Sequence, residues 1–200
     1  MASQVEICNL ALAALGKDGI SSLTEASTAA RYCSLFWKPM LDSLLQSYPW
    51  GFAGKTQSLA EVANDKPGQW LYAYSKPSGC LKIRYVAPDY SEGEALLLTK
   101  KQEFAHPYAV EGQVIYCNLS PAYLVFTRRV TDASLFPPMF VDAIWAHLSA
   151  RLAMPMTRDP AVRRQAYADA AAMMAQAQMA DANDEPETSD HTADAVEARF

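Results

Sequence analysis

The N-terminal part of the chain spaces its apolar residues with the period of a helix. The first apolar stripe consists of Val5, Cys8, Leu12 and Leu15. Ser3 and Glu6 before it have the spacing of a capping box, in which each side chain accepts a hydrogen bond from the other residue's backbone N–H. Gly16 follows the stripe, and glycine tolerates the left-handed conformation that ends many helices. The pattern predicts a first helix between Ser3 and Gly16.

A second and longer helical pattern follows. Its apolar positions are Ala26, Ala30, Cys33, Trp37, Leu41, Leu44 and Tyr48. Ser22 and Glu25 repeat the capping-box spacing and predict the start of this helix, and Pro49 predicts its end. Pro39 lies inside the pattern and has no N–H to donate to the helix. We therefore expect a kink or a break at Pro39.

Between about residues 69 and 130 the apolar period changes from 3.6 to 2. Four short runs are rich in β-branched and aromatic residues: WLYAY (70–74), CLKIRYV (80–86), QVIYC (113–117) and YLVFTRR (123–129). Pro, Gly, Asn and Ser separate them, as is typical of strands joined by turns. The alternation within residues 81–85 and 124–128 gives one covered and one wet face, which favours a small antiparallel sheet. Residues 87–109 have no clear pattern.

Helical spacing returns after the Phe136-Pro137-Pro138 stretch. A ridge of apolar residues recurs every fourth position: Phe140, Ile144, Leu148, Leu152 and Met156. Asp159 followed by Pro160 is typical of a helix start, and predicts a last helix that runs to Ala180. That helix is rich in Ala and Met, which suits a close contact within the chain or between subunits.

These elements predict an α+β protein. A bundle of about four helices, two N-terminal and two C-terminal, is formed by residues 1–60 and 135–180. A small antiparallel β domain, residues 61–134, is inserted between them, and residues 181–200 form an acidic C-terminal tail. No segment approaches the 18 or so apolar residues of a membrane span, and the N-terminus does not resemble a signal peptide. We therefore expect a protein made in the cytoplasm.

Composition narrows the possible functions. The chain has a net charge of −5, but residues 181–200 hold seven acidic residues and one arginine, so the remaining body is almost neutral. Non-specific DNA binding needs a cationic surface that releases counterions, so a protein that grips DNA is disfavoured. The cysteines are widely spaced and form no C-x-x-C pair, which predicts buried free thiols: Cys8, Cys33, Cys80 and Cys117.

The stretch PWGFAGKT, residues 49–56, ends like a phosphate-binding loop. Such a loop needs a glycine where this chain has Pro49, so that successive backbone N–H groups can surround the anion. It also follows a strand and opens a helix, whereas this stretch follows a helical pattern. A nucleotide site is therefore not expected here.

The sequence also contains no clear pattern of metal-binding or catalytic residues. The three histidines, His106, His147 and His191, have no helical metal-site spacing. Four glutamates fall in or near the segment without a clear pattern: Glu92, Glu94, Glu103 and Glu111. Two of these could in principle act as the acid and base of a peptidoglycan hydrolase, which we keep as the alternative function. We expect no enzymatic activity, no cofactor and no metal.

A set of short blocks, ordered along the chain, carries a family resemblance. They are Ile7–Leu12 with Leu15 and Gly16; Ile20, Ser22, Leu23, Glu25, Ser27 and Ala30; Leu44, Leu45, Pro49, Trp50, Phe52 and Ala53; Tyr72, Tyr74, Cys80, Leu81, Ile83 and Arg84; Val110–Gly112 with Ile115; and Val130–Asp132, Leu135–Pro137, Phe140, Ala143, Leu148, Leu152, Ala153, Pro155 and Thr157. Over roughly residues 5–180 this order resembles the head-to-tail adaptor of short-tailed bacteriophages, also called tail tubular protein A. In that family PWGFA is the helix-exit motif, which accounts for the stretch at residue 49.

The resemblance implies a structural virion protein of the phage neck. It implies a ring, of twelve copies in this family, that sits between the capsid portal protein and the tail nozzle protein and lets DNA pass without sequence-specific binding during genome ejection. Such a ring uses a heterologous interface, in which one face of a subunit meets a different face of the next. A neck protein of another phage type is the alternative within this class.

The acidic tail is the candidate partner-binding segment. Its composition has too few apolar groups to build a core of its own. We expect it to bind a basic, partly apolar groove on the portal or on a neighbouring subunit. The candidate residues are Asp181, Asp184, Glu185, Glu187, Asp190, Asp194, Val196, Glu197 and Phe200.

Overall fold

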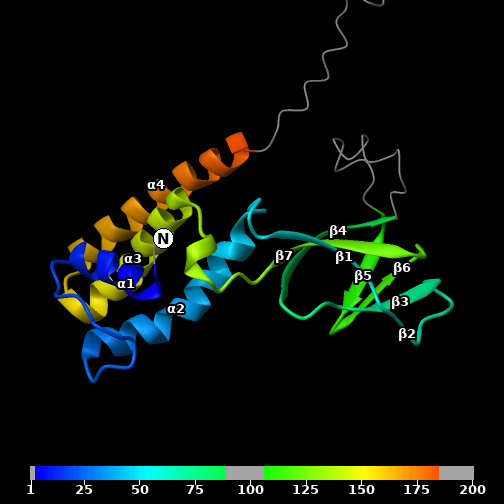
Figure 1. Cartoon of the computed structure of the whole chain (residues 1–200), viewed down its shortest axis with the longest axis horizontal. Helices are drawn as coiled ribbons and strands as arrows, with labels where there is room; N and C mark the ends of the chain where they lie inside the picture. Colours follow the sequence, from blue (N-terminus) through cyan, green and yellow to red (C-terminus); the bar gives the residue numbers. More distant parts are fainter. Residues whose placement is uncertain (1–2, 89–105, 185–200) are drawn as a thin grey trace, which may run out of the picture.

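The structure, a computed structural model, describes residues 3–88 and 106–184 (Figure 1). In chain order the elements are α1 (Gln4–Ala13), α2 (Thr28–Ser47), β1 (Gly54–Ser58), β2 (Glu61–Val62), β3 (Tyr72–Ser75), β4 (Cys80–Pro88), β5 (Tyr108–Glu111), β6 (Val114–Cys117), β7 (Ala122–Arg128), the short 3-10 helix η2 (Ala133–Leu135), α3 (Pro138–Thr157) and α4 (Pro160–Asp184). The helices gather at one end of the molecule and the strands at the other. The predicted α+β class, with helices on both sides of a β insertion, is confirmed.

Local hydrogen bonds fix both ends of α1 as predicted. The Ser3 N–H donates to Glu6 Oε2 at 2.6 Å, and the Glu6 N–H donates to Ser3 Oγ at 3.2 Å, which completes the capping box. At the other end Gly16 has φ +65°, and the Lys17 N–H reaches the Leu12 carbonyl at 3.0 Å. This is the Schellman arrangement, and its left-handed residue favours glycine.

The predicted start of α2 was wrong. The helix begins at Thr28, with Ser27 as its cap, and the Ser27 hydroxyl accepts from the Ala30 N–H at 3.1 Å. Glu25 instead accepts from the Ser21 N–H at 2.8 Å and from the Ser21 hydroxyl at 2.7 Å, within the loop before the helix. The sequence contains two serines that could cap this helix, Ser22 and Ser27, and Ser27 is the one that does.

Of the kink or break predicted at Pro39, the break does not occur, because α2 continues through the proline from Thr28 to Ser47. Loss of the proline hydrogen bond costs about 3 kcal/mol in an ideal helix. Trp37, Met40 and Leu41 on either side of the proline are buried. Burial of each such side chain contributes about 1.5–3 kcal/mol, so the core holds the helix together across the proline.

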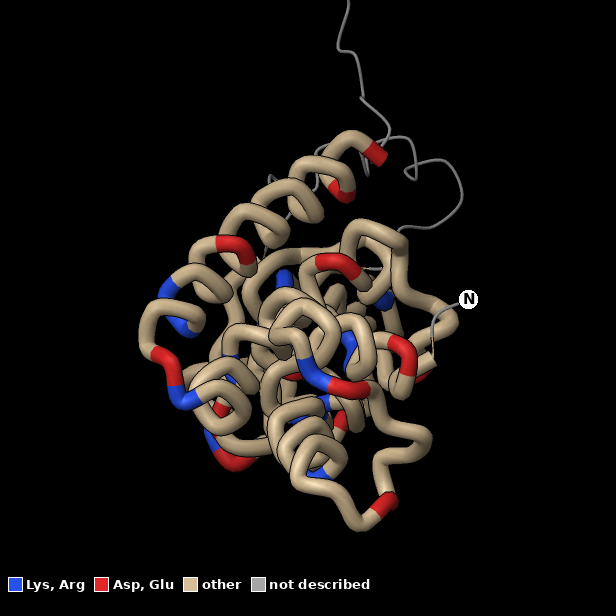
Figure 2. Tube along the Cα trace, turned by 90° about the vertical axis from the view of Figure 1, so that its left-hand side faces the viewer, with Lys and Arg blue, Asp and Glu red and all other residues tan. Residues whose placement is uncertain are grey.

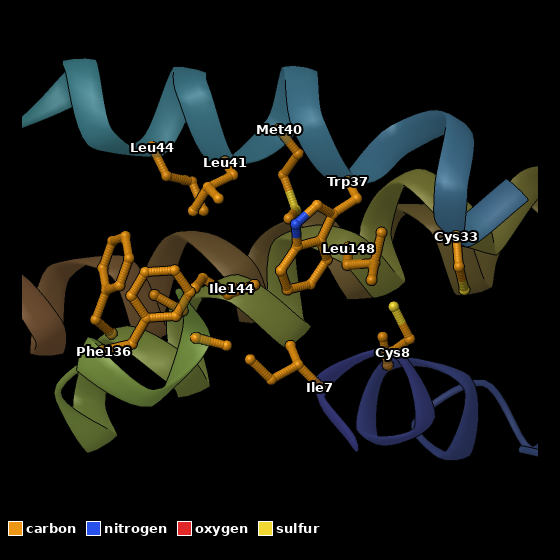
Figure 3. Packing of buried hydrophobic residues seen from close by; sticks show 14 of the residues in the cluster. Ile7, Cys8, Cys33, Trp37, Met40, Leu41, Leu44, Phe136, Ile144 and Leu148 are labelled. Atoms are coloured by element: carbon orange, nitrogen blue, oxygen red, sulfur yellow. The ribbon is translucent and has the colours of Figure 1, made fainter. Parts of the chain in front are cut away.

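The helical end of the molecule has one large apolar core. Side chains of α1, α2 and α3 point into it, as shown for Ile7, Trp37, Leu41, Ile144 and Leu148 in Figure 3. The predicted ridge of α3 lies in this core, except that Met156 is only partly buried. Among the described helices, none is long and apolar enough to cross a membrane.

Two small antiparallel sheets form the other end. Their strand orders are β1-β7-β4 and β2-β3-β6-β5, and the four predicted runs correspond to β3, β4, β6 and β7. The register pairs Ile83 with Phe126 and Tyr74 with Ile115. Irregularities in the β4–β7 register interrupt the alternation expected for residues 81–85, and Ile83, Arg84 and Tyr85 are all half-buried. A second apolar core lies between the sheets, centred on Val86, Ile115, Leu124 and Phe126.

The sequence analysis predicted no strand at the positions of β1, β2 and β5. β1 is Gly54–Ser58, so the β part begins within the range 1–60 that was assigned to the bundle. It pairs with β7 along its length, with Thr56 opposite Val125. The Gly-Lys-Thr end of PWGFAGKT is therefore part of a strand, and it opens no helix that could bind phosphate.

Hydrogen bonds and an ion pair of the described residues join the two parts. Arg84 in β4 donates to the Trp50 carbonyl at 2.6 Å and to Thr127 Oγ1 at 3.1 Å. Arg129, just after β7, makes a two-pronged ion pair with Asp42 of α2, with N–O distances of 2.7 and 2.9 Å. Planar two-pronged pairs of this kind fix orientation, so they set the angle between the sheets and the bundle.

Candidate functional site

The candidate tail residues divide between a helix and the undescribed end of the chain. Asp181 and Asp184 belong to the last turn of α4, which runs past the predicted end at Ala180. The other candidates lie outside the described residues: Glu185, Glu187, Asp190, Asp194, Val196, Glu197 and Phe200. The tail boundary therefore moves to residue 185.

Asp181 belongs to α4 and binds Gly51 of its own chain, which corrects its assignment to the acidic tail. Both of its carboxylate oxygens accept from the Gly51 N–H, at 3.0 and 3.2 Å. Gly51 belongs to the turn that follows α2, so this contact holds the end of α4 against the PWGFAG motif. An acidic residue near a helix C-terminus is unfavourable toward the helix dipole, and the bond to Gly51 offsets that cost.

An aromatic cluster lies beneath the end of α4. Trp50 is almost fully buried, and its indole N–H donates to the Leu44 carbonyl at 2.9 Å. Its ring packs edge-on against Phe140 at 4.7 Å between centroids, and Phe140 packs against Phe52 at 4.8 Å. A small hollow of about 130 Å³ remains between these rings and Ala177 of α4. The motif that resembled a nucleotide loop is thus a packing centre for three helices.

The contact between α3 and α4 is a seam of alanines. It consists of Ala146, Ala150 and Ala153 from α3 and Ala166 and Ala170 from α4. Small side chains let the two helices approach closely, which is the intramolecular contact that the composition of α4 favoured. Only Ala166, Ala170 and Ala177 of α4 are buried, while Tyr167 and Met179 are 46 % and 66 % exposed. Most of the α4 surface is available to another molecule.

A basic groove lies where α2, α3 and the first turns of α4 meet. It has a volume of about 450 Å³ and is lined by Phe36, His147, Arg151, Met154, Arg163 and Tyr167, among others. Burial and the nearby Arg151 guanidinium lower the pKa of His147, so this imidazole is neutral at pH 7. Its Nε2 atom is buried and finds no hydrogen-bond partner among the described residues. The sequence analysis named His147 but did not find the groove.

A larger hollow, of about 830 Å³, lies beside the start of α2. Its lining includes Glu25, Ser27, Arg31 and Leu35. Hydrogen bonds from Ser27 and Ser21 lower the pKa of Glu25 to about 2, so its carboxylate remains charged beside the helix start. The hollow therefore already contains an anion of its own.

Of the residues considered for catalysis, the described part of the chain contains Glu111, His106 and His147. Glu111 is exposed on β5 and pairs with Lys66, which does not create the apolar pocket that raises the pKa of a general acid. Glu92, Glu94, Glu103 and His191 lie outside the described residues. His106 follows the undescribed stretch, and the described chain contains no group of three or more His, Cys, Asp or Glu that could hold a metal ion.

The cysteines are free thiols, as predicted, and Cys8, Cys33 and Cys117 are buried while Cys80 is partly exposed. Cys8 of α1 and Cys33 of α2 face each other inside the helical core (Figure 3). A hydrogen bond with Cys33 and burial raise the pKa of Cys8, so it remains a neutral thiol.

No protein-family model and no curated protein matches this sequence.

Proposed function

We propose that this protein is a structural head-to-tail adaptor of a short-tailed bacteriophage. In this role it forms a ring that joins the capsid portal to the tail nozzle, and DNA passes through the ring during genome ejection. The protein is assembled into the neck of the virion after synthesis in the host cytoplasm. It has no catalytic step and no cofactor in this role.

One observation carries the proposal. Blocks of the resemblance that lie far apart in the sequence, in α1, α2 and α3, pack into a single bundle, and the blocks between them form the inserted β part. Trp50 and Phe140, from two different blocks, meet ring to ring at 4.7 Å. Residues matched separately along the sequence are thus partners in space, which supports reading their order as a family pattern.

The surface of α4 supports assembly into a ring. The helix packs on α3 through a narrow alanine seam, and its other faces are exposed. Its basic residues, Arg163 and Arg164, lie near its start, and Asp181 and Asp184 lie at its end. Figure 2 shows acidic positions at the end of this helix and basic positions toward its start. Two ends of opposite charge fit a heterologous interface, in which unlike faces of adjacent copies meet.

The mass of the purified chain, alone and after mixing with the portal ring encoded by the same genome, tests this function. We expect a monomer in isolation and a closed ring on the portal, of twelve copies if the family stoichiometry holds. An enzyme of the peptidoglycan hydrolase class would instead release fragments from cell walls without any portal. Failure to bind the portal, together with cell-wall cleavage, would overturn the proposal.

A deletion tests the role of the tail in this assembly. Residues 185–200 are removed rather than 181–200, because Asp181 and Asp184 belong to α4. Circular dichroism of the shortened chain verifies that the helices remain. We expect weaker ring formation on the portal, and equal ring formation would exclude the tail from the assembly.

A further inference from the structure

The basic groove between α2, α3 and α4 contains positive charge that no described residue neutralises. Arg151 and Arg163 both line it, and neither has an ion-pair partner within residues 3–88 and 106–184. Arg163 lies over the ring of Tyr167 at 5.6 Å, which holds the guanidinium beside the groove. Two uncompensated guanidinium groups on one hollow attract carboxylates.

The groove also has an apolar side. Phe36 lines it, and Met154 and Tyr167, which are 41 % and 46 % exposed, contribute a thioether and an aromatic ring. A small inorganic anion would leave these apolar side chains exposed to water. A peptide that combines carboxylates with apolar side chains fits both parts of the lining.

The charges of α4 are arranged against the helix dipole. Arginines near the first turns and aspartates in the last turn are each unfavourable toward the dipole. Asp181 is compensated by Gly51, but Arg163 has no such partner within the described chain. A charge that is costly to its own helix indicates an interaction outside it.

The segment that follows α4 has the complementary composition. Residues 185–200 contain five acidic residues and one arginine, together with the apolar Val196 and Phe200. The segment follows Asp184, the last residue of α4, and Tyr167 lies about 25 Å back along the helix from Asp184. The acidic segment therefore begins at the opposite end of α4 from the groove of its own copy, close to where a head-to-tail neighbour would be placed.

We propose that residues 185–200 of one copy bind the basic groove of a neighbouring copy, with their carboxylates on Arg151 and Arg163 and their apolar side chains on Phe36, Met154 and Tyr167. This inference rests on the proposed ring, in which we place the acidic end of one α4 beside the basic start of the next. Each copy then donates one segment and receives one.

Fluorescence anisotropy of a labelled peptide of residues 185–200, titrated with the full-length protein, tests the proposal. We expect saturable binding that weakens as salt is added. The variant Arg151→Glu/Arg163→Glu should bind the peptide at least about tenfold more weakly, because attraction becomes repulsion. A peptide with lysines in place of Glu185, Glu187 and Asp190 should bind this variant better than it binds the wild-type protein, which a merely unfolded variant would not do.

The matched control is Lys55→Glu/Arg128→Glu, which changes the net charge equally at two exposed positions of β1 and β7, outside the groove and outside α4. It should bind the peptide nearly as well as wild type. Equal weakening by both double variants, or no binding of the peptide, would overturn the proposal. Binding only to a full chain whose own segment carries the lysine changes would show that each segment occupies the groove of its own copy, which would also overturn it.

The outcome is separable from that of the proposed function. Ring formation on the portal by the Arg151→Glu/Arg163→Glu variant at the wild-type level would leave the adaptor function in place and remove the groove from it. Peptide binding without ring formation on the portal would retain the groove and contradict the adaptor function.

Discussion

The two long helices α2 and α4 show how differently a helix can be attached to the same bundle. α2 buries seven residues, among them Trp37, Leu41 and Leu44, in the main core. α4 is longer but buries three alanines, and its position depends on the seam with α3 and on the bond from Gly51 to Asp181. Apolar burial scales with the area removed from water, so the fully buried side chains of α2 contribute more to stability than those of α4. The weakly held helix is the one with surface to offer a neighbour.

The largest expected effect is a loss of stability from a substitution in the buried face of α2. Trp37→Ala should lower the free energy of unfolding by about 3–5 kcal/mol, because it leaves a cavity among helices α1, α2 and α3. Leu35→Ala on the same helix is the control, since Leu35 is 61 % exposed and should change stability by less than about 0.5 kcal/mol. Urea denaturation, followed by the far-UV circular dichroism of the helices, measures the free energy of unfolding of both variants. Similar values for the two variants would contradict the assignment of α2 to the core.

A smaller and more local effect is expected at the alanine seam. Ala170 is fully buried between α3 and α4, so Ala170→Leu should overpack the contact and cost about 1–3 kcal/mol. Hydrogen exchange should become faster in α4 while α2 remains protected. Ala171→Leu, at an exposed position of the same helix, should leave exchange in α4 unchanged. Loss of protection in α2 as well would show that the two helices unfold as one unit.

The bond at the end of α4 has a weaker role. Asp181→Ala removes the acceptor of the Gly51 N–H and should cost about 0.5–1.5 kcal/mol in the last turns of the helix. Asp184→Ala makes the same change in helix propensity at an exposed residue of that turn and is the matched control. Exchange of the α4 amides after Ala177 reports the difference. Equal exchange in the two variants would mean that Gly51 does not hold the helix.

The smallest expected effect is a pH dependence of stability that arises from Glu25, in the loop before α2. Bonds from Ser27 and Ser21 lower the pKa of Glu25 to about 2 from an ordinary value of 4.5. A carboxyl whose folded-state pKa is lowered contributes stability above its unfolded pKa, and this contribution is lost as pH falls from about 4.5 toward 2. Stability profiles of wild type and Glu25→Gln should therefore converge in that window. Parallel profiles between pH 5 and 2 would contradict the shift.

Much of the helical part was predictable because its signals are local. The capping bonds of Ser3 and Glu6 span three residues, and the ridge of α3 follows from helical spacing alone. Strands β1 and β5 were missed because GKTQS and YAVE lack a marked alternation, and their pairing with β7 and β6 supplies the hydrogen bonds. The break expected at Pro39 does not occur, because contacts with residues distant in the sequence outweigh the backbone hydrogen bond that proline cannot make.

The basic groove was the least predictable feature. Phe36, His147 and Tyr167 come from three helices that only the bundle brings together. A local signal did exist: arginines near the start of α4 oppose its dipole. That signal indicates an external partner for the helix but not the position of the groove.

By itself the sequence determined the period of each segment, the caps of α1, α3's ridge, the alanine-rich character of α4 and the separation of acidic from basic charge. Periodicity and capping depend on residues within a turn or two of each other, so they can be recognised from the sequence alone. The tertiary structure alone decided that α2 passes through Pro39, that Gly51 holds Asp181, and that two arginines share a groove. Those outcomes depend on free energies of packing between segments far apart in the chain, which local patterns do not contain.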